Sequence, residues 1–207
     1  MAVRMMQMLS MGHHLQKNIN AGQLFGLENI YDHYLSEGAA DRMCAYLKER
    51  WEKPGSRYHV MKEMFACLHK LEVLSADWPK KVRHYEKGLF GGGRKQYEAL
   101  HQYRMPDKIA EQLLSYFIYV YFAGAVYDGM PYSKVKLAVI STMLIEDMVC
   151  AKAAEKVQLS FEAIADAAHS YAREVEHSDL NLQRLSIMFR HQKCFHIGRL
   201  CGALLEW

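Results

Sequence analysis

The sequence lacks a strong excess of charge of either sign. Its 207 residues include 26 basic and 23 acidic side chains, which gives a net charge of +3. The basic residues are scattered rather than gathered in one segment, so the charge pattern does not indicate a groove for nucleic acid. We therefore expect no nucleic-acid partner.

Closely spaced cysteines are also lacking. The cysteines lie mostly far apart and form no C-x-x-C motif, which argues against a disulfide framework; they are Cys44, Cys67, Cys150, Cys194 and Cys201. The first residues, MAVRMMQMLSMGHHLQ, lack the long apolar core and the small-residue cleavage site of a signal peptide. We expect free thiols in a reducing compartment, and hence a cytoplasmic protein.

A long, purely apolar run is missing as well. The stretch LLSYFIYVYFAGAV, residues 113–126, has 14 residues and four hydroxyl groups, whereas a membrane-spanning helix needs roughly 20 apolar residues. We therefore expect no membrane partner and interpret 113–126 as a buried helix. The next segment, 132–155, is too long for one strand, and Pro131 before it suits a first helical turn. These two apolar helices are expected to pair in the core.

Apolar residues recur at helical spacing, and no segment shows the alternation of apolar and polar residues that is typical of a strand. Segments 38–53 and 57–74 are separated by Pro54-Gly55-Ser56 and have apolar residues at helical spacing. The sequence predicts an all-α fold, a single-domain multi-helix bundle over residues 1–207 with a central buried apolar helix pair. Residues 80–103, with GLFGGGR at their centre, predict an irregular Gly-rich loop. The glycines resemble an anion cradle only weakly, because no strand precedes them and no Gly-Lys-Ser/Thr follows.

Eleven histidines raise the question of a metal site. Glu98-x-x-His101 and Glu174-x-x-His177 match the spacing with which di-iron carboxylate bundles present two ligands. Because Glu and His are both frequent in this chain, such pairs also arise by chance, and pairing on a helix surface is the simpler explanation. We expect no metal in this chain and keep a di-iron carboxylate helical bundle as an alternative.

Residues 171–182, YAREVEHSDLNL, crowd ionisable side chains together. If one helix continues through Ser178, an apolar stripe steps by three and four residues from Ile164 to Phe189. Arg173 and Glu176 then point away from the core and are interpreted as solvated side chains. A polar strip lies along the shoulder of the stripe and is a candidate pocket wall, formed by Ser170, Glu174, His177 and Asn181.

A helix break is the competing interpretation of the same residues. Ser178 or Asp179 has the side chain of an N-cap, and the segment LNLQRLSIMFRH that follows suits a new helix. Glu174 and His177 would then lie in the last turn of the preceding helix. The sequence leaves both interpretations open.

Two longer segments resemble a known family. They are IAEQLLSYFIYVYFAGAVYDGMPYSKVKLAVISTMLIEDMVCAKAAE and LSFEAIADAAHSYAREVEHSDLNLQRLSIMF, within residues 109–189. The Lys-Val-Lys-Leu-Ala-Val segment, and above all YAREVEHSDLNL, resemble the C-terminal region of the flagellin lysine N-methylase family of bacteria. The family carries a closely spaced Cys cluster near its N-terminus, and this chain has none. The resemblance thus implies either a short relative or the C-terminal helical part of a split or truncated methylase.

The resemblance implies S-adenosylmethionine as methyl donor and a lysine side chain of flagellin, or of another protein substrate, as acceptor. We hypothesise that Glu174 attracts the substrate ammonium, that His177 orients it or relays its proton, and that Asn181 fixes Glu174. Ser170 belongs to the same polar strip. The aromatic walls suited to a cation would be Tyr116, Tyr119 and Tyr171.

Without the Cys cluster, catalysis by this chain alone is in question. The first alternative is a non-catalytic substrate-docking or partner-binding module, which would use the same helices to bind flagellin or a Cys-bearing partner subunit. The di-iron bundle is the second alternative, and it requires both Glu-x-x-His pairs to face one interior cavity. A homo-oligomer is compatible with each of these functions.

Overall fold

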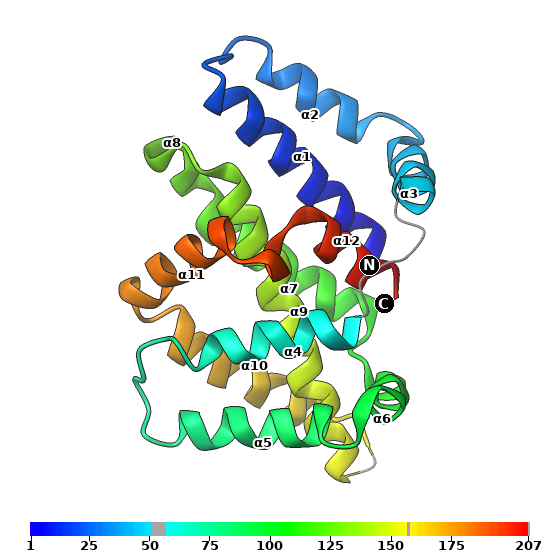
Figure 1. The fold of residues 1–207 in the computed structure, drawn as a ribbon, viewed down its shortest axis with the longest axis vertical. Helices are drawn as coiled ribbons and strands as arrows, with labels where there is room; N and C mark the ends of the chain where they lie inside the picture. Colours follow the sequence, from blue (N-terminus) through cyan, green and yellow to red (C-terminus); the bar gives the residue numbers. More distant parts are fainter. Residues whose placement is uncertain (51–56, 157, 207) are drawn as a thin grey trace.

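The computed structural model describes residues 1–50, 57–156 and 158–206, and every regular element in this part of the chain is helical (Figure 1). The predicted all-α fold class is therefore confirmed. The predicted turn Pro54-Gly55-Ser56 lies outside the described residues. The elements are α1 (Ala2–Asn20), α2 (Leu27–Leu35), α3 (Ala39–Arg50), α4 (Arg57–Leu68), α5 (Trp78–Phe90), α6 (Gly93–Leu100), η1 (His101–Tyr103), α7 (Asp107–Tyr121), η2 (Phe122–Gly124), α8 (Ala125–Asp128), α9 (Pro131–Lys156), α10 (Phe161–Val175), α11 (Asp179–His191), η3 (Lys193–Phe195) and α12 (Ile197–Leu205).

Helix α9 is the centre of the bundle. It begins at Pro131, which suits a first turn because its missing N–H would have no partner within the helix. From Val135 to Ala151 every residue is buried, as expected for a mostly apolar helix that is enclosed by others. Helices α1, α4, α5, α7, α10 and α11 pack against it, and α1 also packs against the last helix, α12 (Figure 1).

Helix α7, the other member of the predicted apolar pair, packs against α9 with one face only. Ala110, Leu114 and Phe117 are buried at helical spacing, whereas Tyr119 on the opposite face is 88 % exposed. The expected burial of 113–126 is therefore only partly right. Asp107–Asp128 is the one described segment long and apolar enough to cross a membrane, and 17 % of its most apolar window is buried. A single segment of this kind is weak support for a membrane, and the absence of a membrane partner stays a prediction.

Residues 80–103 belong to α5, α6 and η1 apart from a turn at Gly91 and Gly92, so the predicted irregular loop is wrong. Trp78, Val82, Tyr85 and Leu89 recur at spacings of four and three and are buried, and this apolar face stabilises α5 in spite of Gly88. The chain bends between α5 and α6 at the triple glycine, where Gly93 has a φ of +79°. The glycines allow a local bend, but they do not prevent helix formation on either side, where buried apolar residues recur at helical spacing.

Candidate functional site

The predicted site lies where α10 meets α11, and the helical structure is interrupted there. Helix α10 ends at Val175 and α11 begins at Asp179. Ser178 between them has an extended backbone, and its Oγ accepts a hydrogen bond from the backbone N–H of Asn181 at 3.1 Å. Ser178 is thus the N-cap of α11. The capping interpretation is confirmed, and the apolar stripe does not continue through one helix.

Asn181 joins this junction to the segment between α4 and α5. Its Oδ1 accepts from the backbone N–H of Glu72 at 2.6 Å, and its Nδ2 donates to the carbonyl of Glu72 at 2.9 Å. The same Nδ2 donates to the backbone carbonyl of Glu174 at 2.7 Å. Asn181 is fully buried, so these bonds satisfy an amide that would otherwise be costly to enclose. Asn181 therefore holds the backbone of Glu174, and its predicted role in substrate binding stays a prediction.

The Glu174 carboxylate faces the same segment. Its Oε2 accepts from the backbone N–H of Leu74 at 2.9 Å, and its Oε1 lies 3.8 Å from Nε of Arg173. The residue is 0 % exposed. An enclosed carboxylate bonded to a backbone N–H stabilises the segment that carries the N–H. The geometry gives Glu174 a structural role, and the substrate-binding role stays a prediction.

The other predicted site residues lie in different surroundings. His177 is exposed in the turn before the α11 cap, and Ser170 is buried with its Oγ 3.3 Å from Nζ of Lys81. Tyr171 is buried, and its hydroxyl lies 2.8 Å from Oγ of Ser141 on α9. Tyr119 is exposed on α7. The structure thus brings Glu174 and Asn181 together, while no hydrogen bond among the described residues joins His177 or Tyr119 to them.

Glu176 bonds to Tyr116, one of the three predicted aromatic wall residues, and to Tyr121, which the sequence interpretation did not include. The hydroxyls of Tyr116 and Tyr121, both on α7, donate to its Oε2 at 2.9 Å each. The ring of Phe117 stacks on Tyr121 at 6.3 Å and meets Tyr171 edge-on. The interpretation of Glu176 as a freely solvated side chain is wrong. The partners lie more than 50 positions away in the sequence, so only the packing of α7 beside the end of α10 could reveal them.

The two phenols at Glu176 are held in the neutral form. Burial raises the pKa of Tyr121, and the hydrogen bond to Glu176 and the charge of its carboxylate raise this pKa further. The pKa of Tyr116 is raised for the same reasons in the same order. Both hydroxyls therefore remain hydrogen-bond donors at physiological pH.

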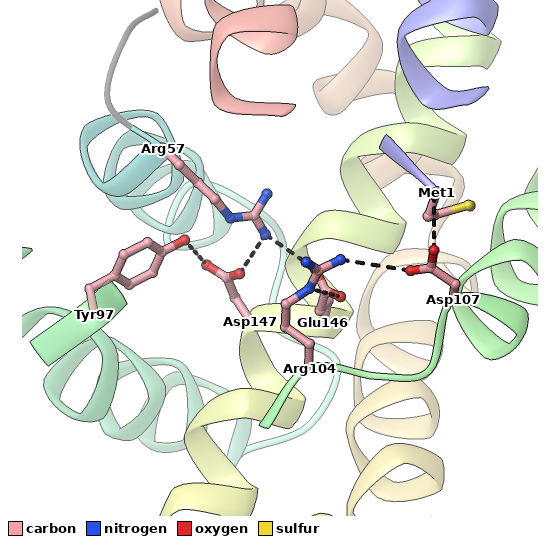
Figure 2. A network of polar contacts seen from close by, with 7 residues as sticks. All are labelled: Met1, Arg57, Tyr97, Arg104, Asp107, Glu146 and Asp147. Atoms are coloured by element: carbon pink, nitrogen blue, oxygen red, sulfur yellow. Dashed lines mark hydrogen bonds and ion pairs between the residues drawn. The ribbon is translucent and has the colours of Figure 1, made fainter. Parts of the chain in front are cut away.

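A second polar cluster, which the sequence interpretation missed, is buried at the centre of the bundle (Figure 2). Nη2 of Arg57 lies 2.8 Å from Oδ1 of Asp147 and 3.3 Å from Oε2 of Glu146. The hydroxyl of Tyr97 donates to Oδ2 of Asp147 at 2.7 Å, and Nε of Arg104 lies 3.4 Å from Oε1 of Glu146. This central network connects α4, α6 and α9. The signal in the sequence was a Glu-Asp pair inside an otherwise apolar helix.

The central network reaches the surface through Asp107. Its Oδ1 lies 3.8 Å from Nη2 of Arg104, and its Oδ2 lies 3.1 Å from the amino nitrogen of Met1 (Figure 2). In the interior, burial raises the pKa of Glu146 to about 7, although Arg57 and Arg104 favour the charged form. Burial also favours a neutral Arg57, but Tyr97 and the two carboxylates outweigh it and raise the pKa of the guanidinium. A carboxylate that titrates near neutrality is a pH-sensitive element of the core.

The potential metal ligands do not converge. Among the described residues there is no group of three or more His, Cys, Asp or Glu side chains that could hold a metal ion. Glu98 is bonded to Arg94 on the surface of α6, while Glu174 is enclosed beside α11. The two Glu-x-x-His pairs therefore do not share one cavity, and the di-iron alternative loses its ligand set.

Two of the thiols lie close to each other. Sγ of Cys67 donates to Oε1 of Gln192 at 2.9 Å, and Sγ of Cys194 lies 4.0 Å from the same oxygen. All five cysteines are free. They lie on separate elements, namely α3, α4, α9, η3 and α12.

Comparison with known proteins adds one finding. A family model described as the FliB lysine N-methylase C-terminal domain matches residues 1–203, well beyond the 109–189 core of the resemblance. The chain matches no curated protein and no solved structure.

Proposed function

The chain belongs to the family of FliB lysine N-methylase C-terminal domains, and from this premise we propose that it binds the protein substrate for methylation of flagellin lysine side chains. The observation that carries the proposal is the family match over residues 1–203. We also propose a cytoplasmic location, which is supported by the free state of all five thiols.

Methylation of a lysine sets three physical requirements. The amine must be bound, stripped of water and held in line with the methyl donor, and it must lose a proton before it can act as a nucleophile. A rigid helical body can meet the binding and orienting requirements. The bundle around α9 offers such a body, and the exposed tyrosines of α7 offer a surface for a protein substrate.

S-adenosylmethionine is the methyl donor that the family implies. The triple glycine is the feature of the sequence that most resembles an anion cradle, but the structure does not fit a cradle for the carboxylate of this donor, which carries no phosphate. The N–H of Gly91 already donates to the carbonyl of Lys87 at 3.0 Å, and the side chain of Gln96 fills the space over Gly92. We therefore assign no step through the donor to this chain, and we propose that a Cys-bearing partner subunit holds the donor.

The roles of Glu174 and His177 are part of the proposal in a narrower form. Glu174 is enclosed, so it would act on a substrate only through the segment that it holds by the N–H of Leu74. His177 is exposed next to Glu176 and is open to a substrate bound on α7. A positioning role for Glu174 and a contact role for His177 are consistent with this geometry.

The experiment combines binding with product analysis. Flagellin monomers are titrated with the purified chain, and a parallel sample receives S-adenosylmethionine and a cell extract that lacks this chain. We expect saturable binding of flagellin, and methylated flagellin lysines in mass spectra only when chain and extract are combined. Failure to bind flagellin, or methylation that is independent of the chain, would show the proposal to be wrong.

The alternative function is a non-catalytic module that binds flagellin or a partner subunit. The exposed tyrosines of α7 and the absence of a convergent set of metal ligands among the described residues are consistent with it. The same experiment separates the two functions. Saturable binding without any chain-dependent methylation supports the module, whereas chain-dependent methylation supports participation in the reaction.

A further inference from the structure

Glu176 is a carboxylate that pairs with no cation in the described part of the chain. It is partly buried at the end of α10, and it makes no ion pair with any described residue. Two hydroxyl groups donate to its Oε2, from Tyr116 and Tyr121. Neutral donors stabilise a carboxylate and fix its orientation, but they leave its charge uncompensated. No donor among the described residues bonds to its Oε1, which is not one of the enclosed side-chain oxygens.

The surroundings of Glu176 are aromatic and open. Tyr116, whose hydroxyl bonds to the carboxylate, is 48 % exposed. Farther along the chain, Tyr119 on α7 and Tyr127 on α8 are almost fully exposed. Rings of this kind attract cations through their π faces. A carboxylate next to such rings is suited to an organic cation rather than to an anion or a neutral group.

We propose that Glu176, Tyr116 and Tyr121 form a subsite for the protonated side-chain amine of a lysine in the protein substrate. The inference rests on the proposed function and specifies the site that the function requires. The substrate segment would lie along α7 and α8, and its lysine would place the ammonium group against Oε1 of Glu176, between the two phenol rings.

The arrangement favours an ammonium group over a guanidinium group. Arginine binds carboxylates most strongly when both oxygens accept a pair of parallel N–H bonds. At Glu176 two phenol hydroxyls already engage Oε2, which leaves one oxygen. A single oxygen suits a compact point charge such as the ammonium of lysine. Phenols that stay neutral add no competing negative charge.

Glu176 can be reached by a substrate lysine, whereas Glu174 is enclosed. Glu174 is 0 % exposed, and its Oε2 accepts the Leu74 N–H. A lysine chain could reach it only if the segment between α4 and α5 moved away. The two carboxylates lie two positions apart in the sequence but face different elements. Glu176 bonds to α7, whereas Glu174 bonds to the segment before α5.

The experiment follows peptide binding by nuclear magnetic resonance. The probe is a blocked glycine-serine peptide with one central lysine, and two companion peptides carry acetyl-lysine or norleucine at that position. We expect the lysine peptide to shift amide signals of residues 116–121 and 174–178, and the companions to leave them unchanged. Glu176→Gln should weaken the lysine peptide about fivefold, the upper range for a solvent-accessible ion pair.

Matched variants separate binding from folding. Glu176→Gln keeps an acceptor for the two phenols and is checked by its melting curve. Glu98→Gln removes an exposed carboxylate on α6 and should bind as the wild type does. Glu176→Lys supplies an ammonium of its own and should abolish binding. The inference is wrong if Glu176→Gln or Glu176→Lys binds the lysine peptide as tightly as the wild type, or if the acetyl-lysine peptide shifts the same signals.

Binding of whole flagellin distinguishes this inference from the proposed function. If wild type and Glu176→Gln bind flagellin equally well, the subsite is wrong and the proposed function stands. If the wild type does not bind flagellin, the proposed function is wrong. Weaker binding by Glu176→Gln, with unchanged binding by Glu98→Gln, supports both.

Discussion

At the scale of single residues, Glu174 stabilises the segment between α4 and α5 through the hydrogen bond from the N–H of Leu74. Replacing Glu174 with Ala removes this acceptor and leaves a cavity in place of a side chain that is 0 % exposed, and we expect the free energy of unfolding to fall by about 2 kcal/mol. Glu174→Gln retains an acceptor and should cost less than half as much. Urea denaturation measures both values.

The control for Glu174 is Glu98→Ala on the exposed surface of α6, which should change stability by no more than about 0.5 kcal/mol. A different outcome would restore the role predicted from the sequence. If Glu174→Ala keeps its stability and loses flagellin binding, Glu174 acts on the substrate and its bond to Leu74 is incidental.

Glu146 makes the stability of the protein depend on pH. Its pKa rises from 4.5 to about 7 in the folded state, mainly through burial. Between these two values the folded state binds a proton that the unfolded state has released, so the stabilisation is complete below pH 4.5 and is lost as pH rises to about 7. Glu146→Gln cannot titrate. From pH 4.5 to pH 7 the variant should therefore gain up to about 3 kcal/mol relative to the wild type.

Urea denaturation at several pH values across this window measures the difference between Glu146→Gln and the wild type. Glu155→Gln is the control, because Glu155 lies on the same helix and is exposed. A difference that is independent of pH would mean that Glu146 stays ionised in the folded protein and that Arg57 and Arg104 outweigh its burial.

At the scale of elements, the junction between α10 and α11 depends on one hydroxyl group. Oγ of Ser178 accepts from the N–H of Asn181 and donates to Oε2 of Glu72 at 2.9 Å. Ser178→Ala removes the cap and the second bond, and we expect a loss of about 2 kcal/mol, of which the cap contributes roughly half. Thermal or urea unfolding measures the loss.

Ser160→Ala is the matched control for this junction. Ser160 caps α10 through the N–H of Ala163, and its hydroxyl has as its other side-chain partner the fully exposed Glu162, a contact open to solvent. Its replacement should cost about 1 kcal/mol. Equal losses for the two variants would show that the bond from Ser178 to Glu72 adds nothing to stability.

The helices differ in how well their position and burial could be predicted from the sequence. The apolar run of α9 predicts its helix correctly, and the helical period of α4 predicts a helix that begins at the right residue but ends at Leu68, six residues before the predicted end. Burial of a face or of a whole helix gives a regular apolar spacing. The glycines at 91–93 concealed the apolar period of α5, and the aromatic run of α7 suggested burial on all sides. Propensity and composition report local preference, whereas exposure depends on which neighbours a helix meets.

In the candidate site, too, local features could be predicted from the sequence and contacts between distant residues could not. The cap at Ser178 is local and could be predicted as one of two alternatives from its side chain and its neighbours. The bonds of Glu174 to Leu74 and of Glu176 to Tyr116 join residues 100 and 60 positions apart. No short-range pattern contains such pairs, so the sequence could identify the crowded segment but could not assign its side chains to partners.

At the scale of the whole molecule, α9 and the central network explain why the bundle has one centre. Arg57 on α4 and Tyr97 on α6 both bind Asp147 on α9, so three helices share one buried carboxylate. Removing one charge from such a group leaves the others uncompensated in a place of low polarity. The network therefore requires the three helices to pack together and disfavours arrangements that separate them.

The distribution of ligands over the whole molecule predicts its metal content. The five cysteines lie on five elements, and the described residues hold no group of three metal-binding side chains. A protein iron site needs several ligands at one place. We expect iron and acid-labile sulfide well below one equivalent in chain purified without air, measured together with the ultraviolet-visible spectrum. Stoichiometric iron with sulfide would mean that cysteines from more than one copy, or rearranged helices, assemble a cluster, and the chain would then contribute more to the methylation chemistry than substrate binding.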